Sequence, residues 1–420
     1  MIKSVISVAV SAALVSGAAV AGSFNFTPID SSASDEMWTR EAPFKIPAGF
    51  GQYVVKDEST LNIYDNGRDD WHDMNTTNET GKKTGRFMYT THELRLPAAL
   101  PEGGTVTAHD LKTGKTVILD QDPSYNALDG IKWTPWGTIL FAEETTGGRL
   151  FEIVLNDDMM SGTTYDRPAV GRIAHEGIDI DEDGNVYVVD EFRGEREGYG
   201  GGIYKFVPDA YGDLSSGDLY VLGTSEADGT GQGAWLGPID ASDARNSGTD
   251  FGGHGYNRPE DLEIIDGVLY AAITEGPRNG TSTQEYDGRV IAINLESMMV
   301  SNFVVPGKNA PVEIGRPGDA NFQTGFDNPD NLAESPDGRL VIVEDNVPSD
   351  VWFAGDADGD GVADSIDLFA SLSDYGAEGT GIYFIPGKSN TMYINIQHSK
   401  EQDGDGTWAI KKGLSKGLAR

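Results

Sequence analysis

The 420-residue chain contains no cysteine, and basic residues are few. The lack of cysteine excludes disulfides, thiolate metal sites, iron–sulfur clusters and a cysteine nucleophile. Lys and Arg number 31 against 67 Asp and Glu, which gives a formal net charge of −36 at pH 7. Because an acidic surface repels nucleic acid and anionic membranes, we expect neither as a partner. The same negative charge attracts cations, so we expect metal ions as partners.

Long hydrophobic runs are also missing, except at the start of the chain. Residues 1–21 combine Lys3 with an apolar stretch and end in Ala19-Val20-Ala21 before Gly22. This pattern predicts a Sec-type secretory signal peptide without a twin-arginine pair, the alternative being an uncleaved anchor. We therefore expect an exported protein, periplasmic or extracellular, with no membrane span and one monomeric domain over 22–420.

An internal repeat organises the remaining chain. The segments 130–144, 177–191 and 331–345 align without a gap, each with an apolar start, a glycine turn, a β-rich run and terminal acids. Residues 261–275 match with a small slip, and weaker copies stand at 85–94 and 381–398. Repeats of this kind predict an all-β fold, a six-bladed β-propeller with loop insertions, with a β-sandwich or β-helix as the alternative.

Acidic residues recur at one position of this repeat, just before its first strand. They are Asp129, Glu176, Glu260, Asp330 and Glu378. Equivalent positions of a propeller lie on a ring around its axis, where carboxylates repel one another unless they bind a cation or share protons. The alternative is that these acids only cap turns.

A second acidic set closes the next strand of each repeat. It comprises Glu93, Glu143, Glu144, Asp190, Glu191, Glu275, Glu344 and Asp345. The first set supplies the expected axial metal ligands, among them Asp129, Glu176, Glu260 and Asp330, and some acids of the second set are expected to lie outside the site. Such oxygen ligands suit Ca²⁺, Mg²⁺ or Mn²⁺, and ferric iron is a further candidate.

A separate loop, DADGDGVADSID at 356–367, has the spacing of an EF-hand calcium loop. Its predicted ligands are Asp356, Asp358, Asp360, the Val362 carbonyl, Asp364 and Asp367. Asp replaces the usual Glu at the last position, which shortens the reach of that carboxylate. The alternative is a solvated acidic turn. Flanking strand signals indicate an inserted structural loop.

Two further side chains are candidates for the active site. His398 ends the last repeat near the expected axis, and its alternative role is that of a hydrogen-bonded structural histidine. Arg258, next to Glu260, has the chemistry to bind an anionic substrate in a bidentate way, or to pair with the surrounding acids.

Several motifs together resemble the PhoX-type alkaline phosphatases. They are Thr91-His92-Glu93, TPWGT at 134–138 followed by Glu143-Glu144, RPE at 258–260, PDNL at 329–332 with Glu344-Asp345, and NIQH at 395–398. The resemblance implies a six-bladed propeller with an axial site of iron and calcium that hydrolyses phosphomonoesters. It also implies metal binding by Glu260, Glu144, Asp330 and Glu344, and phosphate contacts from Thr138 and Arg258.

The chain departs from this family at one position that matters for the metal. The family typically has a cysteine ligand five residues before the TPWGT threonine, where this chain has Asp129. A hard carboxylate in place of a soft thiolate favours a site dominated by Ca²⁺, with Fe³⁺ in second place. We thus expect a secreted, metal-dependent phosphatase acting on a small phosphorylated substrate. A calcium-dependent lactonase or esterase and a non-catalytic calcium-binding propeller are the alternatives.

Overall fold

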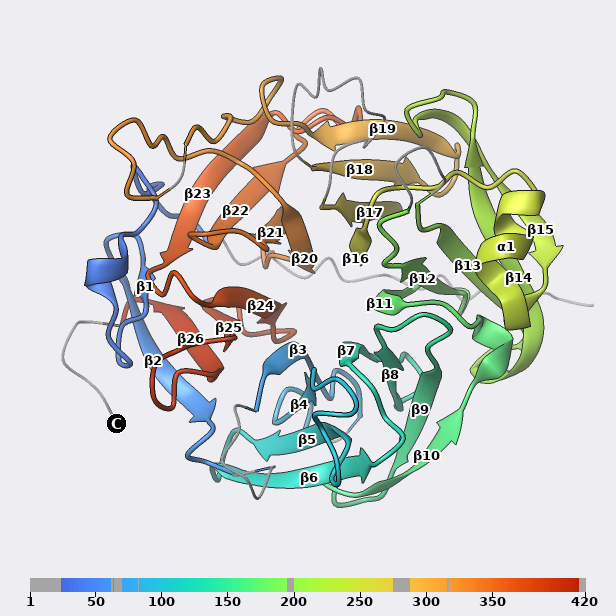
Figure 1. The fold of residues 1–420 in the computed structure, drawn as a ribbon, viewed down its shortest axis with the longest axis horizontal. Helices are drawn as coiled ribbons and strands as arrows, with labels where there is room; N and C mark the ends of the chain where they lie inside the picture. The colour runs from blue at the N-terminus through green and yellow to red at the C-terminus, as the bar shows by residue number, and fades with distance from the viewer. Residues whose placement is uncertain are drawn as a thin grey trace, which may run out of the picture.

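The computed structural model describes residues 24–61, 63, 70–81, 83–194, 200–274, 288–315 and 317–414. The signal peptide predicted at 1–21 and the acid Glu275 lie outside these residues. The described chain is built almost wholly of antiparallel β-sheets arranged around a common centre (Figure 1). The all-β, propeller-like fold expected from the repeat is therefore confirmed.

Four of the sheets are separate units. The first contains β3 (His72–Thr77), β4 (Phe87–His92), β5 (Gly104–Asp110) and β6 (Lys115–Asp122), and the second β7 (Leu128–Trp133), β8 (Ile139–Glu143), β9 (Leu150–Leu155) and β10 (Gly162–Asp166). The third contains β20 (Pro329–Glu334), β21 (Leu340–Glu344), β22 (Asp350–Gly355), β23 (Ser365–Leu372) and the short β1 (Phe44–Lys45). The fourth contains β24 (Glu378–Phe384), β25 (Thr391–Gln397), β26 (Gly406–Lys412) and β2 (Phe50–Asp57).

The fifth sheet has nine strands, which differs from the expected row of separate four-stranded blades. One half contains β11 (His175–Ile180), β12 (Val186–Asp190), β13 (Ile203–Ala210), β14 (Asp213–Thr224) and β15 (Gly231–Ile239), and the other β16 (Pro259–Ile265), β17 (Val268–Ile273), β18 (Arg289–Asn294) and β19 (Met299–Val304). The halves are joined only where β15 meets β19, through the pairs Gly231↔Val300 and Gln232↔Met299. The structure thus has four separate sheets and one joined sheet, where the sequence predicted six blades.

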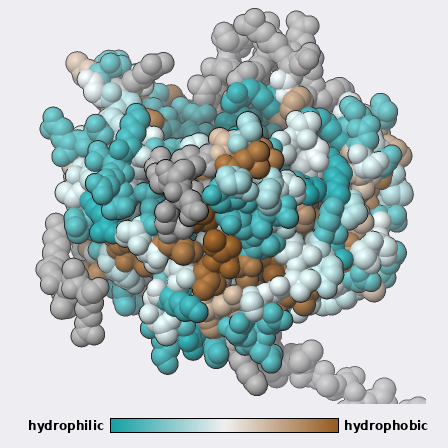
Figure 2. All heavy atoms as spheres, turned by 60° about the horizontal axis from the view of Figure 1, so that its bottom comes forward, coloured by the Kyte–Doolittle hydropathy of each residue, from teal (hydrophilic) through white to brown (hydrophobic). Residues whose placement is uncertain are grey.

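Helices are few and short among the residues that the structure describes. They are η1 (Asp35–Met37), η2 (Pro168–Val170), η3 (Ala241–Asp243) and α1 (Ala244–Asp250). In the described part of the chain, no helix has the length and apolar character needed to cross a membrane. Hydrophilic residues dominate the face seen in Figure 2, with one gathering of hydrophobic residues near its middle.

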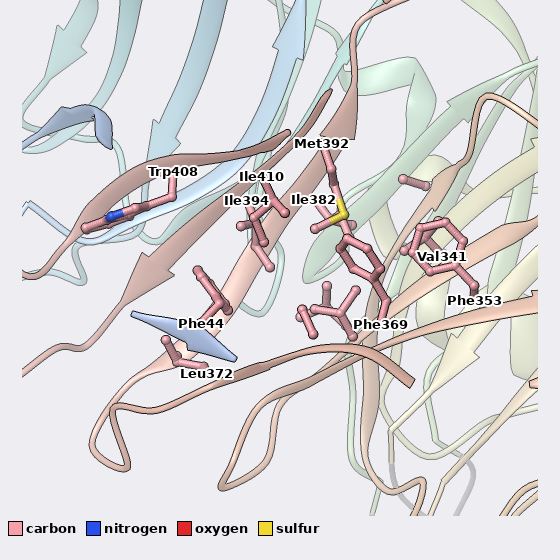
Figure 3. Packing of buried hydrophobic residues seen from close by; sticks show 14 of the residues in the cluster. Phe44, Val341, Phe353, Phe369, Leu372, Ile382, Met392, Ile394, Trp408 and Ile410 are labelled. Atoms are coloured by element: carbon pink, nitrogen blue, oxygen red, sulfur yellow. The ribbon is translucent and has the colours of Figure 1, made fainter. Parts of the chain in front are cut away.

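Hydrophobic cores lie between neighbouring sheets. Figure 3 shows one of them, in which Val341, Phe353 and Phe369 of one sheet meet Met392 and Trp408 of the next. The two halves of the nine-stranded sheet also pack face to face, because residues of β12–β14 share a core with residues of β16–β18. Side chains alternate between the two faces of a strand, so a strand buried on both faces is apolar along its whole length.

The innermost strands form a closed circle. In order they are β3, β7, β11, β16, β20 and β24, each packed against the next, with β24 packed against β3 (Figure 1). The N-terminal β2 completes the sheet formed by β24–β26. Circular closure brings equivalent ends of these six strands to the same place on the axis, which is where the repeated acids begin each strand.

Candidate metal centre

A β-bulge at the start of five of the six innermost strands positions the axial carboxylates. In β7, for example, Leu128 pairs with Glu143 and Ile131 with Phe141, so three steps along β7 oppose two steps along β8. The same irregularity occurs in β3, β11, β16 and β20. The acids inside these five bulges are Asp73, Asp129, Glu176, Glu260 and Asp330. Because a bulge re-aims a side chain, it turns these carboxylates away from the regular pleat.

The sixth innermost strand departs from this pattern. Its bulge lies between Thr380 and Tyr383 and contains Gly381, at φ +53°. A Cβ atom at this position would overlap the carbonyl oxygen of Asp73, so only glycine fits there. The acid of this strand, Glu378, stands earlier in the chain and pairs with Gln397.

The bulge acids converge within the molecule. Carboxylate oxygens of Glu176, Glu260 and Asp330 all lie within 4.8 Å of one another, and all three residues are buried. A second group with the same spacing consists of Asp330, Asp345 and Glu378. Asp330 belongs to both groups, so the two form one continuous cluster.

Burial and mutual repulsion raise the pKa values of these carboxyl groups. Burial first, and then the neighbouring Glu144 carboxylate, raise the pKa of Asp129 well above its ordinary value. The pKa values of Glu176 and Asp330 are raised in the same way by burial and then by Glu260. Burial also raises the pKa of Glu260, to about 7, although the Arg258 guanidinium opposes this shift. Such a cluster is stable only with bound protons or bound cations.

The second acidic set divides into two structural classes, because consecutive residues of a strand point to opposite faces. The first acid of each pair binds a backbone N–H: Glu143 accepts from Asn126 at 3.0 Å, Asp190 from Ala174 at 2.9 Å and Glu344 from Asp327 at 2.8 Å. The second acid of each pair lies near the cluster: Glu144, Glu191 and Asp345, with Glu93 in the first sheet.

Backbone hydrogen bonds hold this second class in place. The N–H groups of Glu93, Glu144, Glu191 and Asp345 donate to the carbonyls of Trp71, Ala127, Ala174 and Asn328, each two residues before a bulge acid. Trp71, Ala127 and Asn328 have φ values of 39°, 51° and 39°, an uncommon conformation for residues with side chains. Strained backbone of this kind clusters at functional sites.

Glu344, predicted as an axial ligand, is placed differently from that expectation. Its Oε1 atom accepts hydrogen bonds from the Asp327 N–H and from Trp352 Nε1, each at 2.8 Å. Its neighbour Asp345 is the residue that joins Asp330 and Glu378. The structure therefore groups Asp345 rather than Glu344 with the axial acids, because a single step along the chain moves a side chain to the opposite face of a strand.

Two arginines lie among these acids. Arg258 pairs with Glu191, with Glu260 at 3.0 Å and with Asp345 at 3.5 Å. Arg95 pairs with Glu93 at 2.7 Å and with Glu144, and half of its side chain is exposed. Arg258 thus forms the ion pairs with surrounding acids that were considered for it, and these pairs hold its guanidinium beside the cluster, where an anionic substrate would bind.

His398 also reaches the cluster. Its Nε2 atom lies 3.1 Å from Glu378 Oε1 and 4.0 Å from Glu93 Oε2. The imidazole ring packs edge-on against Trp71, with 4.3 Å between the ring centroids. About a third of the side chain is exposed, so it borders the cluster at an accessible edge.

Thr138 lies away from the cluster, against the expectation that it contacts phosphate. Its hydroxyl donates to Glu152 Oε1 at 2.6 Å and lies 2.9 Å from Thr134 Oγ1. Asp129 is the second residue of β7, and Thr138 follows the turn at the other end of that strand, about 15 Å away at 3.3 Å per residue. A cavity of about 1460 Å³ opens at that end and is lined by Pro135 but by none of the five bulge acids.

The loop at 356–367 has three acids within metal-binding distance, Asp356, Asp358 and Asp360. The Asp356 carboxylate accepts from the N–H groups of Gly359 and Gly361, and Asp360 Oδ1 accepts from the Val362 N–H at 2.9 Å. Asp364 closes the loop by accepting from the Ala357 N–H at 2.8 Å.

Asp367, predicted as the last ligand of this loop, lies on β23 and faces Arg339 at 3.6 Å. In an EF-hand, the loop leads into a helix, but here a strand starts at Ser365. A strand rises more than twice as far per residue as a helix, so it carries Asp367 away from the other acids.

Asp73 and Arg95 were not found by sequence reasoning. Asp73 stands 12 residues before its turn glycine, Gly85, whereas the spacing is eight in the clearest repeats, so the alignment does not reveal it. Asp73 can be found from the acid that follows the next strand. Glu93, after β4, is equivalent to Glu144, after β8, so β3 should carry an acid equivalent to Asp129 of β7. No pattern marks Arg95.

The residues of the cluster fit a hard metal ion. Asp129 occupies the position of the family cysteine and brings an oxygen ligand, and its Oδ1 atom is buried without a hydrogen-bond partner. The donors are all carboxylate oxygens, as Ca²⁺ prefers and as ferric iron accepts. A soft ion that requires thiolate does not fit this set.

Comparisons with known proteins give one family and one fold. No curated protein sequence matches the chain significantly. The structure of Pseudomonas fluorescens PhoX in complex with vanadate, a transition state analogue, is 19% identical, with a TM-score of 0.64 over 92% of this chain and 98% of that one. The pyranose dehydrogenase PQQ domain from Coprinopsis cinerea has a TM-score of 0.50 at 11% identity, over 88% and 97% of the two chains.

The family comparison covers more than half of the sequence. Residues 147–400 match the model of alkaline phosphatase PhoX, a segment that includes Glu176, Arg258, Glu260, Asp330 and His398. The chain therefore belongs to the alkaline phosphatase PhoX family.

Proposed function

We propose that the protein hydrolyses phosphomonoesters of small molecules at the axial carboxylate cluster, with bound metal ions. The observation that carries this proposal is the convergence of Glu176, Glu260 and Asp330 inside a chain of a phosphatase family. The bound metals would neutralise the phosphate, polarise its P–O bonds and lower the pKa of a coordinated water.

The protein side chains have distinct parts in this reaction. Glu176, Glu260 and Asp330 hold metal ions, with Asp129 and Asp73 beside them and Glu144 and Asp345 at the outer edge. Arg258 has five N–H donors, and its contacts with three acids fix the guanidinium while leaving donors for a phosphate oxygen. Arg95 lies in a more exposed position and orients the same anion.

His398 is the proposed proton donor to the leaving group. Hydrolysis breaks the P–O bond to the alcohol, adds the oxygen of water to phosphorus and requires a proton on the departing alkoxide. An imidazole is the side chain most often used for proton transfer in enzymes, and the Nε2 atom of His398 lies 3.1 Å from Glu378 Oε1. Its partly exposed position suits a group that meets the alcohol end of the substrate.

We propose Ca²⁺ as the main metal of the cluster, with Fe³⁺ as an additional occupant. Asp129 in place of the family cysteine supports this order, because carboxylate binds both ions whereas thiolate selects softer ones. The loop at 356–367 is proposed as a second, structural Ca²⁺ site formed by Asp356, Asp358, Asp360, the Val362 carbonyl and Asp364. Asp367 is left out because of its contact with Arg339.

We also propose that the fold is a six-bladed propeller, exported by the segment 1–21 and composed of a single domain over 22–420. Six inner strands and a core between every neighbouring pair of strand groups support six blades, two of which share the nine-stranded sheet. On this count each blade supplies one inner strand. A PhoX solved structure with 98% coverage supports the single domain.

The test is a phosphomonoesterase assay on the purified exported chain, with p-nitrophenyl phosphate, after metal removal and after addition of Ca²⁺, Fe³⁺ or both. We expect chelation to abolish turnover, Ca²⁺ to restore it, and E260Q to lower kcat/KM by about a hundredfold or more. E226Q, at an exposed acid in the turn between β14 and β15, is the matched control and keeps full activity. A fully metallated protein with no phosphatase activity would refute the proposal, and lactone hydrolysis in its place would favour the calcium lactonase.

A further inference from the structure

Arg245 lies on the short helix α1, in the connection between the two halves of the nine-stranded sheet, where α1 packs against β15 (Figure 1). Its guanidinium binds Asp190, at the end of β12, through two hydrogen bonds: Nε to Oδ2 at 2.6 Å and Nη2 to Oδ1 at 2.7 Å. The Asp190 side chain is completely buried, and 22% of the Arg245 side chain is exposed. A bidentate pair of this kind fixes the orientation of both groups as well as their distance.

The same guanidinium also packs against Phe192. Its central carbon lies 3.8 Å from the centre of the phenyl ring, which is a cation–π contact. Asp190 and Phe192 stand on either side of Glu191 in the chain, and the Phe192 N–H donates to the Asp190 carbonyl at 2.7 Å. Arg245 therefore holds both neighbours of Glu191 and fixes the turn that carries this acid.

The turn held by Arg245 contacts Arg258 in two ways. The Glu191 carboxylate binds Nε of the Arg258 guanidinium, and the Phe192 carbonyl accepts from the Arg258 N–H at 3.3 Å. The first contact fixes the Arg258 side chain. The second fixes its backbone at a φ of +53°, which a residue with a side chain rarely adopts. The conformation of Arg258 thus depends on the turn at 190–192.

We propose that Arg245 is a positioning residue for substrate binding, which fixes the phosphate-binding guanidinium of Arg258 through Asp190 and Phe192. This inference rests on the proposed phosphatase function of the axial cluster. A guanidinium that is already fixed loses less conformational freedom when phosphate binds, so pre-organisation strengthens binding. Since Arg245 acts on the substrate through its neighbours, its substitution should weaken binding more than it slows the chemical step.

Arg149 offers a matched control, because an equivalent ion pair occurs in the sheet of β7–β10. It binds Glu143, at the end of β8, through both carboxylate oxygens at 2.6 and 2.8 Å. The residue after Glu143 is Glu144, whose carboxylate binds Arg95. R149K therefore weakens a similar structural pair but leaves unchanged the turn that contacts Arg258.

The test compares R245K with R149K in the fully metallated protein. Lysine keeps the positive charge but cannot form the bidentate pair. The readouts are kinetics with p-nitrophenyl phosphate and calorimetric titration with inorganic phosphate. We expect R245K to raise both the KM for the ester and the Kd for phosphate about tenfold while kcat stays close to wild type. R149K should lower the melting temperature as R245K does, but leave KM, Kd and kcat near their wild-type values.

A double variant with R258K tests whether Arg245 acts through Arg258. We expect R245K/R258K to bind phosphate as weakly as R258K alone, whereas independent effects would add. F192L removes the ring contact but keeps the ion pair, so it should raise the Kd for phosphate by a smaller factor, and it replaces R245K if that variant fails to fold. Unchanged phosphate binding in these variants, additivity with R258K, or an equal rise of KM in R149K would overturn the inference. A wild-type protein that binds phosphate without hydrolysing its esters would refute the proposed function alone.

Discussion

Glu143 and Glu144 are neighbours in the chain with opposite roles in the structure, and substituting each by glutamine tests the division directly. Glu143 is buried and binds Arg149 through both oxygens, at 2.6 and 2.8 Å, together with the N–H groups of Asn126 and Arg149 at 3.0 Å each. Glu144 lies beside Asp129 and is held near Glu93 and Glu191.

The expected loss of stability in E143Q follows from the ion pair. Removing one partner of a fully buried pair costs about 3–5 kcal/mol, and since the Arg149 side chain is 28% exposed we expect about 2–3 kcal/mol. An unfolding entropy of about 2.1 cal/mol/K per residue gives about 0.8 kcal/mol/K for roughly 400 residues. The melting temperature of E143Q should therefore fall by about 3 °C, while kcat/KM below that temperature stays near the wild-type value.

E144Q should behave in the opposite way. Burial raises the pKa of Glu144 well above its usual range; the Arg95 guanidinium opposes this shift, and the Glu93 and Glu191 carboxylates add to it. A neutral amide removes this repulsion, so the metal-free melting temperature should change by no more than about 1 °C. Loss of a metal ligand should weaken Ca²⁺ binding about tenfold or more, which removes about 1.4 kcal/mol, or about 2 °C, from the stabilisation by Ca²⁺.

The assay is differential scanning calorimetry with and without Ca²⁺, alongside phosphatase kinetics at limiting Ca²⁺, with E226Q as the control. The reasoning is refuted if E144Q lowers the metal-free melting temperature as much as E143Q does. It also fails if E143Q loses activity without losing stability, because the alternation of side chains along β8 would then not separate the two roles.

Three further predictions concern other parts of the molecule. T138V should lower stability by about 1–3 kcal/mol through the lost hydrogen bond to Glu152, but it should leave kcat/KM unchanged in the phosphatase assay, whereas R258K should reduce kcat/KM. The double variant D358N/D360N should bind one Ca²⁺ fewer by elemental analysis and keep its phosphatase activity, and an unchanged metal count would contradict a calcium loop. Burial and then the Lys56 ammonium lower the pKa of His109 to about 4, so the fold favours neutral imidazole and stability is lost as pH falls from about 6.5 towards 4. Urea unfolding should show a loss between pH 7 and 5 that is about 2 kcal/mol smaller in H109N than in wild type, and equal losses would refute this assignment.

Much of the architecture was predictable because it repeats. The glycine turns at Gly137, Gly184 and Gly338 and the β-rich runs around them predict antiparallel strand pairs, and the structure has a strand pair at each. The count of separate sheets was less predictable. It depends on the contact of β15 with β19, which joins strands about 60 residues apart through two residue pairs.

The repeat also predicted the ligands of the cluster, but only some of them. Glu176, Glu260 and Asp330 stand at equivalent positions of similar repeats, and the structure brings them together. Asp73 has a longer strand connection after it, so its equivalence becomes visible only in the strand pairing. Thr138 shows the limit of carrying a role over from a motif, because the turn that holds it lies at the other end of β7.

By itself, the sequence determined the class of fold, the excess of carboxylates, the absence of thiolate and the repeat position at which acids recur. These properties reside in composition and in short-range periodicity, which a chain carries before it folds. Only the tertiary structure decided which of two consecutive acids faces the axis, as for Glu344 and Asp345. That choice depends on strand register and on one-residue bulges, and a shift of a single residue turns a side chain from the metal cluster to the opposite face of its strand.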